Sequence, residues 1–350
     1  MEENIIYSLL GNNFIGYAVS AIIVILFITV YALIAILAEL KISAWMQRRY
    51  GPWRNTWHGV GQPLIEVIKL LQKENVTPDR ADKVLFNLAP FIVFMGALMA
   101  FAVIPFGELL IPSSLNVGIF YVFAVSAFGV VGIIIGGWAS HNKYSLLGSM
   151  RAAAQMVSYE IPISICLLSI AALNGSLDMQ TIISNQSGWF WDWNIFGGSG
   201  EITKLFILPF TLALFIMYFI ATLAETNRTP FDLPEGESEL VAGYSTEYSG
   251  MKFAMFYLAE YTNMFIVSAL ITVMFLGGWN SPFGDFLNYS WLHPVWFVGK
   301  AFGIVVLQII VRWTLPRLRV DQLMHTTWKV LVPLSIVCFF AIALYTMLAL

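Results

Sequence analysis

Charged residues are scarce in this chain. Asp, Glu, Lys and Arg make up only 11% of its 350 residues, whereas 59% are hydrophobic. So little charge, with the apolar residues gathered in long blocks, excludes an ordinary soluble domain. Eight segments approach the roughly 20 apolar residues that a helix needs to cross a membrane, at about 15–38, 84–105, 118–138, 157–174, 204–224, 252–276, 295–312 and 328–349. The sequence therefore predicts an all-α polytopic membrane protein, with residues 1–350 as a single transmembrane domain of eight transmembrane helices.

Residues that bind metals or redox centres are also few. The two cysteines, Cys166 and Cys338, lie in different apolar segments and form no CxxC motif, which argues against an iron–sulfur cluster. The four histidines lack the spacing of a metal site, and the sequence has no glycine-rich nucleotide-binding fingerprint. We therefore expect no metal site and no covalently bound or redox cofactor in this chain.

The few basic residues are distributed unevenly. Sixteen of the 18 Lys and Arg residues fall in or beside four connections between the predicted spans, and only Lys204 and Lys300 fall on the other side. By the positive-inside rule these connections are cytoplasmic, and both termini lie on the outer side. The four connections, at about 41–83, 139–156, 225–251 and 313–327, are the expected functional loops. The expected surroundings are a lipid bilayer, and no nucleic acid.

The first of these loops contains a helical pattern. Residues 62–74, QPLIEVIKLLQKE, separate an apolar face from a polar one at the helical period, and Pro63 suits a first helical turn. The stretch is too short to span a membrane. It predicts a short interfacial helix, which serves either as a connector or as the entrance for an amphipathic ligand.

Acidic residues concentrate in the third loop, AETNRTPFDLPEGESELVAGYSTE at 224–247. The loop contains one base, Arg228, and the carboxylates Glu225, Asp232, Glu235, Glu237, Glu239 and Glu247. Acids within or against transmembrane segments are rare and by default mark ion or proton pathways. The sequence therefore predicts that this loop handles protons.

Further carboxylates fall inside the predicted spans. Glu39 ends the first span, Glu160 lies near the start of the fourth, and Glu260 lies in the sixth, about 12 Å along the helix at 1.5 Å per residue. An ionised acid at a helix centre costs about 2.5–3.5 kcal/mol, so we expect Glu260 to face protein or water. For Glu39, an ion pair with Lys41, two residues away, is an equally good interpretation.

Four stretches together resemble a known family. The string AETNRTPFDLPEGESELVAGYSTEYSGMKFAMFYLAEY at 224–261 is similar to the fifth-to-sixth-helix loop of the H subunit of bacterial NADH:quinone oxidoreductase, or respiratory complex I. That protein is the counterpart of mitochondrial NADH dehydrogenase subunit 1. The other stretches, in the same order, are MQRRYGPW at 46–53, NKYSLLGSMRAAAQMVSYEIP at 142–162 and RWTLPRLRVDQLMHTTWK at 312–329.

The resemblance implies a function. Members of that family have eight helices, lie where the membrane arm meets the hydrophilic arm, form much of the quinone channel and begin the proton path. The resemblance implies a translocase subunit in the bacterial inner (plasma) membrane, with quinone, either ubiquinone or menaquinone, as substrate. NADH and the iron–sulfur clusters are then expected on partner subunits. The expected partners are the small membrane subunits and the peripheral quinone-module subunits.

The resemblance also implies roles for individual residues. It places Glu160, Glu225 and Glu260 on the family's intramembrane proton-path acids, and Asp232, Glu235, Glu237, Glu239, Glu247 and Arg228 on its acidic loop. Together with Glu39, these residues form the predicted proton path. It places the quinone channel at Arg48, Arg49, Trp53, Arg312, Arg317 and Arg319, with Arg151 as the arginine of the second loop.

The chain departs from the family pattern at two positions. The family commonly has Glu-Arg-Lys at the end of the first helix, where this chain has Glu39, Leu40 and Lys41. We expect this loss of a guanidinium to shift the charge balance to Arg48, Arg49 or Arg54. The familiar Gly-Pro-Asn is here Gly51, Pro52 and Trp53, which puts an aromatic ring at the expected channel mouth.

Two other functions fit parts of the sequence. One is the membrane anchor subunit of a proton-pumping hydrogenase, which copurification with a nickel subunit would indicate. The other is a stand-alone ion-coupled transporter, but such proteins often contain internal repeats and a midplane site. This chain has no recognisable repeat, and its charges gather near one face.

The orientation is directly testable. In a chain without its two native cysteines, single cysteines at positions 116 and 285 should react with an impermeant reagent from the outer face, whereas cysteines at 235 and 321 should not. Outer labelling at position 321 would refute the orientation.

Overall fold

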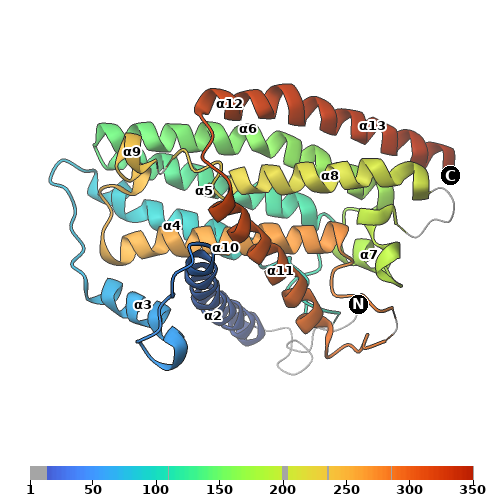
Figure 1. Ribbon diagram of the computed structural model, residues 1–350, viewed down its shortest axis with the longest axis horizontal. Helices are drawn as coiled ribbons and strands as arrows, with labels where there is room; N and C mark the ends of the chain where they lie inside the picture. The colour runs from blue at the N-terminus through green and yellow to red at the C-terminus, as the bar shows by residue number, and fades with distance from the viewer. Residues whose placement is uncertain (1–13, 109, 199–203, 235, 285, 350) are drawn as a thin grey trace.

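A computed structural model describes residues 14–108, 110–198, 204–234, 236–284 and 286–349. Its α-helices are α2 (Phe14–Met46), α3 (Gln62–Gln72), α4 (Lys83–Ala100), α5 (Gly118–Ala139), α6 (Lys143–Asn174), α7 (Met179–Ser184), α8 (Lys204–Glu225), α9 (Glu237–Leu240), α10 (Gly250–Phe275), α11 (His293–Thr314), α12 (Val320–Thr326) and α13 (Val332–Ala349) (Figure 1). A π-helical turn, Thr327–Leu331, joins α12 to α13. Among the described residues, eight helices are long and apolar enough to cross a membrane, which confirms the predicted fold class.

Helix α10 is the centre of the bundle. In its most apolar stretch 83% of the residues are buried, far more than in any other spanning helix of the described chain. It packs against α2, α4, α8 and α11, while α5, α6 and α13 lie farther out (Figure 1). Glu260, in the middle of α10, is partly buried.

Small residues bring neighbouring helices close together. On α5, a Cβ added to Gly132 would lie 2.4 Å from Val93 of α4, and one added to Gly137 would lie 2.1 Å from Ser149 of α6. Small residues at such contacts allow helix backbones to approach closely in a membrane, where packing replaces the hydrophobic drive. The α4–α5–α6 layer depends on these contacts.

Two helices begin earlier than the hydropathy suggests. Helix α6 starts at Lys143 rather than near residue 157, so most of the expected loop at 139–156 is helical. Asn142 caps it by accepting a hydrogen bond from the backbone N–H of Tyr144, and the Ala-rich stretch that follows favours helix despite its polar members. The last spanning helix similarly begins at Val320 instead of residue 328.

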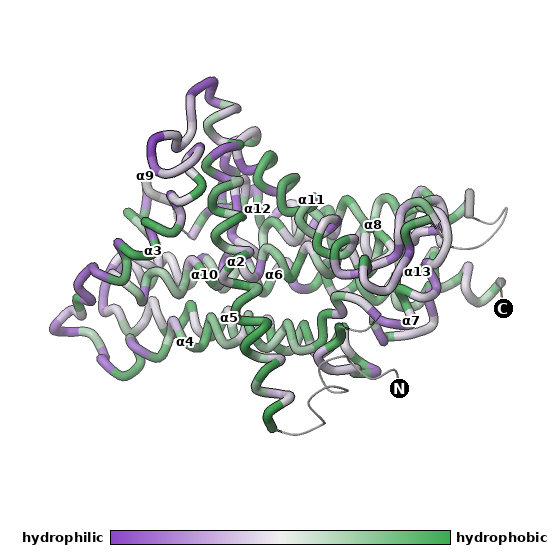
Figure 2. The backbone as a smooth tube through the Cα atoms, turned by 90° about the horizontal axis from the view of Figure 1, so that it is seen from below, coloured by the Kyte–Doolittle hydropathy of each residue, from purple (hydrophilic) through white to green (hydrophobic). Residues whose placement is uncertain are grey.

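The four basic connections meet at one end of the bundle. Ser249 Oγ donates to the carbonyl of Glu74, Asn142 Nδ2 donates to Glu247, and the backbone N–H of Leu318 donates to the carbonyl of Pro230. The third connection, residues 226–249, therefore touches the other three. We call this connection the acidic loop, and this end of the bundle the acidic-loop end. Figure 2 shows hydrophilic segments gathered around α9 and the α3–α4 connection.

Helix α2 leaves a long apolar surface uncovered. Its first half exposes Phe14, Ile22 and Leu26, and Figure 2 shows this part standing away from the other helices. Helix α3 is formed as expected, but only Pro63 in it is buried. The second half of α2, by contrast, packs into the core through Ile28, Tyr31 and Ala35.

Candidate functional site

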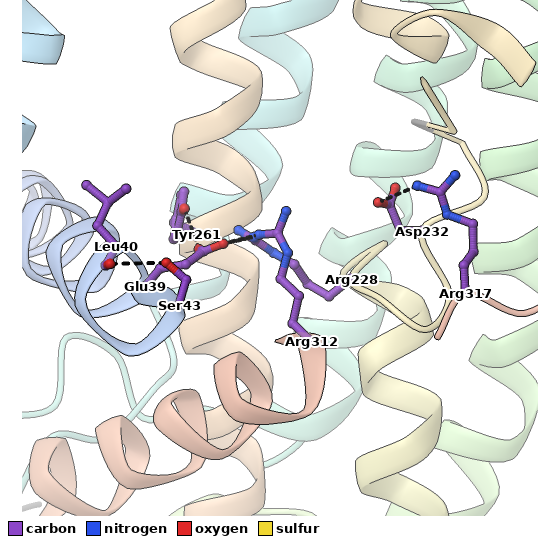
Figure 3. Close-up of polar contacts among 8 residues, drawn as sticks. All are labelled: Glu39, Leu40, Ser43, Arg228, Asp232, Tyr261, Arg312 and Arg317. Atoms are coloured by element: carbon purple, nitrogen blue, oxygen red, sulfur yellow. Dashed lines mark hydrogen bonds and ion pairs between the residues drawn. The ribbon is translucent and has the colours of Figure 1, made fainter. Parts of the chain in front are cut away.

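The carboxylate of Glu39 is the meeting point of four segments. It lies near the end of α2 and is 8% exposed. Arg228 Nη1, from the acidic loop, donates to Glu39 Oε2 at 3.3 Å, and Arg312 of α11 donates to Oε1. Tyr261 Oη of α10 donates to Oε2 at 2.7 Å (Figure 3). A buried carboxylate needs such charge pairing and hydrogen bonds to offset its loss of hydration.

Arg228 and Arg312 together bring two positive charges to the single negative charge of Glu39, and Arg228 is the more deeply buried of the two. Its guanidinium lies over the ring of Tyr261, 4.6 Å from the centroid. Burial alone would lower the pKa of Arg228, but Glu39, Tyr261 and Glu260 raise it well above its ordinary value, so it stays charged. Its Nε and Nη2 are buried, and neither has a hydrogen-bond partner in the described part of the chain. Two donors are therefore available for a ligand oxygen or for water.

A second ion pair lies beside the cluster. Arg317 Nη2 donates to Asp232 Oδ2 at 3.1 Å (Figure 3), and Asp232 Oδ1 is buried with no partner among the residues that the structure describes. Burial raises the pKa of Asp232, and the neighbouring Arg317 counters this only in part. Asp232 thus binds a proton more readily than an ordinary aspartate does.

Two guanidinium groups from distant segments supply the charge opposite Glu39. The expected substitutes near Leu40, namely Arg48, Arg49 and Arg54, are exposed and take no part in the cluster. Leu40 points away from the guanidinium groups (Figure 3). Arg228 and Arg312 instead supply the positive charge that compensates Glu39.

Lys41 does not pair with Glu39. Residues two apart on a helix do not face each other. Lys41 Nζ instead donates to the carbonyls of Pro52 and His58, at 2.8 Å and 2.7 Å. It thereby holds the turn that carries Trp53. The Trp53 ring is exposed, and its centroid lies 4.3 Å from that of the His58 ring.

The acids on α6, α8 and α10 lie in two different places. Glu260, next to Tyr261 on α10, accepts a hydrogen bond of 2.9 Å from Tyr244 Oη. Glu225 ends α8 and is close enough to Glu160 of α6 for the two to act on each other electrostatically. The structure therefore brings Glu39 and Glu260 to α10, and Glu160 and Glu225 to the α6–α8 pair.

The remaining predicted residues lie nearer the surface. Arg151 pairs with Glu239 at 2.5 Å, and Glu247 pairs with Asn142 at 2.6 Å. Arg319 pairs only with Asp321, which is highly exposed. Glu237 begins α9, but its side chain, like the whole of Glu235, lies outside the described part of the chain.

Sequence reasoning missed three polar residues that build this region. Tyr261 and Tyr244 hold Glu39 and Glu260, and the buried Gln155 of α6 donates to the carbonyls of Ala224 and Phe231. Gln155 thus fixes both ends of the segment that carries Arg228. A fully polar amide in an Ala-rich membrane helix was the available signal for Gln155.

Comparison with known proteins gives a consistent result. Residues 19–343 match the family model described as NADH dehydrogenase. The chain is 49% identical over 346 residues to the NADH-quinone oxidoreductase H subunit of Chlorobaculum tepidum, covering 95% of this chain and 92% of that protein. It is 50% identical over 340 residues to the H subunit of Chlorobium luteolum, covering 95% and 89%. It is 42% identical over 351 residues to the H subunit of Anaeromyxobacter dehalogenans, covering 95% and 83%.

The raised pKa of Asp232 predicts a pH dependence with a definite sign. The folded loop binds a proton more tightly than the unfolded one, so its stability is greatest below the ordinary Asp pKa of about 4 and falls as pH rises through the raised value. Hydrogen exchange of residues 229–234, corrected for intrinsic rates, should show protection that declines with pH in the wild type. Asp232→Asn should remove this decline, and Asp321→Asn, in an exposed pair, should not. Protection that increases with pH would contradict the assignment.

Proposed function

This chain belongs to the family of the NADH-quinone oxidoreductase H subunit, and on that premise we propose that it forms the quinone-access channel of the complex and couples quinone reduction to proton translocation through its buried carboxylates. The family membership confirms the resemblance seen in the sequence and makes the chain a membrane subunit of a multi-subunit translocase. The proposal extends this to the residues that carry the two tasks.

The observation that carries the proposal is the buried Glu39 cluster. It combines one carboxylate with two guanidinium groups at the junction of α2, α10, α11 and the acidic loop. The unpartnered Nε and Nη2 of Arg228 suit a quinone carbonyl oxygen, which accepts hydrogen bonds but donates none. This cluster is the polar end of the proposed channel.

An entrance for the quinone lies on the side of α3. An amphipathic ligand needs an apolar mouth at the lipid boundary and polar groups deeper in. Helix α3 exposes Leu64, Ile65 and Leu71, and a hollow of about 330 Å³ lies beside it, lined by Trp53, Arg54 and Gln62 among others. Trp53 is thus placed to contact lipid or the quinone tail, with Arg48 and Arg49 on the neighbouring turn.

Coupling follows from the charge balance of the site. Reduction of a quinone to a quinol takes up two electrons and two protons. Carboxyl groups that give up these protons become negatively charged, and they then attract protons from neighbouring acids. Glu260 is the next acid, because both Arg228 and Asp232 act on it electrostatically. Glu225 and Glu160 follow deeper in the bundle. NADH oxidation and the iron–sulfur clusters belong to partner subunits, which we place against the acidic-loop end.

The channel predicts where a quinone can be trapped. In the assembled complex, a photoreactive quinone should crosslink within residues 45–75, because this segment contains both Trp53 and α3. Excess unlabelled quinone should lower the labelling. Crosslinks confined to residues 105–117 or 276–292, at the opposite end of the bundle, or labelling insensitive to quinone, would place the channel elsewhere.

The carboxylates are predicted to contribute unequally to proton pumping. Glu225→Gln should strongly lower pumping, whereas Glu239→Gln and Glu237→Gln should be milder, because several neighbouring loop acids titrate together and substitute for one another. The measurement is the number of protons pumped per quinone reduced in proteoliposomes, with the rate of quinone reduction followed in parallel. Wild-type values in all three variants would show that the loop acids are structural.

A further inference from the structure

A cavity inside the bundle reaches Glu225 from the side away from the acidic loop. It measures about 30 Å³ and lies among α4, α5, α6, α8 and α10. Its polar lining comes from Glu225, Tyr218, Asn263 and Ser126. A water molecule needs about 10–15 Å³ and two to four polar partners, so the cavity has room and partners for one or two waters.

Tyr218 is the polar residue of this lining that most needs a partner. Its side chain is fully buried, and its hydroxyl has no hydrogen-bond partner among the described residues. A buried hydroxyl left unpaired costs about 1–3 kcal/mol, which water in the adjoining cavity would relieve. Ser126 Oγ donates to the carbonyl of Phe123 and keeps its lone pairs for the cavity.

The positions along the helices give the cavity a direction. Tyr218 lies seven residues before Glu225 on α8, or about 10 Å from it along the helix axis. Asn263 follows Glu260 by three residues on α10, so the two occupy one face of that helix. Beyond Asn263 the lining is apolar, with Ile266, Val267 and Leu270 of α10. The cavity therefore extends from the acids toward the opposite end and stops at an apolar wall.

We propose that this cavity binds water that receives the proton of Glu225 on the side away from the acidic loop, with Tyr218 and Asn263 as the residues that position the water. The O–H bond of the neutral Glu225 carboxyl breaks, and its proton passes to the water oxygen. The carboxylate left behind is the counter-ion of the protonated water and regains a proton from the side of the acidic loop. Tyr218 stays neutral and only donates or accepts hydrogen bonds. The inference rests on the proposed function, since it requires Glu225 to carry protons.

Three variants of the assembled complex test the cavity without altering an acid. Tyr218→Phe removes only the hydroxyl, and Asn263→Leu removes the amide. Ala100→Val adds methyl groups at the cavity wall and displaces water while leaving every polar group in place. Thr272→Val is the matched control, because its buried hydroxyl on α10 bonds only to the carbonyl of Ser268 and lies outside the cavity lining.

The expected result has two parts. The three cavity variants should lower the coupled pumping rate about three- to tenfold, the factor expected for the loss of one hydrogen bond. Infrared difference spectra should show the carbonyl band of protonated Glu225, identified by its loss in Glu225→Gln, shifted in Tyr218→Phe and Ala100→Val. Thr272→Val should match the wild type in both measurements.

The same experiment separates this inference from the function on which it rests. If Glu225→Gln pumps poorly while Tyr218→Phe and Ala100→Val keep wild-type pumping and an unshifted band, the cavity takes no part and the inference is overturned. If Glu225→Gln itself pumps like the wild type, the proposed function fails instead. Tyr218→Phe is nearly isosteric, so it remains decisive even if the overpacked Ala100→Val complex does not assemble.

Discussion

The structure depends on the neutralisation of one buried carboxylate. Glu39 has little contact with water, and two guanidinium groups and a tyrosine hydroxyl surround it. Removing one partner from such a group leaves an uncompensated charge, which costs about 3–5 kcal/mol in buried pairs. Its partners come from the acidic loop, α10 and α11, so this group joins the end of α2 to three other segments, while Ile28, Tyr31 and Ala35 pack the middle of α2 into the core.

The same arrangement connects the proposed quinone site with the membrane interior. Tyr261 binds Glu39, and its neighbour Glu260 binds Tyr244, so two adjacent residues of α10 belong to different hydrogen-bonded groups. Arg228 interacts electrostatically with both Glu39 and Glu260, so the two carboxylates share one buried partner, and such interactions are stronger inside a protein than in water. Helix α10 suits this coupling, because most of its residues are buried by other helices and its one acid, Glu260, is hydrogen-bonded to Tyr244.

Much of the fold, but less of the site, was predictable from the sequence. Eight apolar segments and the clustering of basic residues predicted the helices and the grouping of four loops, and the comparisons confirmed the family. Hydropathy placed the start of α6 too late, because hydropathy measures neither capping by Asn142 nor the helix propensity of the residues that follow. The two arginine partners of Glu39, Arg228 and Arg312, lie 189 and 273 residues away from it in sequence. No local pattern identifies such pairs, and the nearby Lys41 was the wrong candidate because of helix geometry.

The most direct test of this account is a double-mutant cycle on Glu39 and Arg228 in the assembled complex. Hydrogen exchange of residues 226–234 would give the free energy of local opening for wild type, Glu39→Gln, Arg228→Met and the double variant. The account predicts that each single change destabilises the loop and that the double change costs less than their sum, with a coupling of about 0.5–3 kcal/mol. Additive effects, or an unchanged loop in Glu39→Gln, would show that the acidic loop is held without this ion pair.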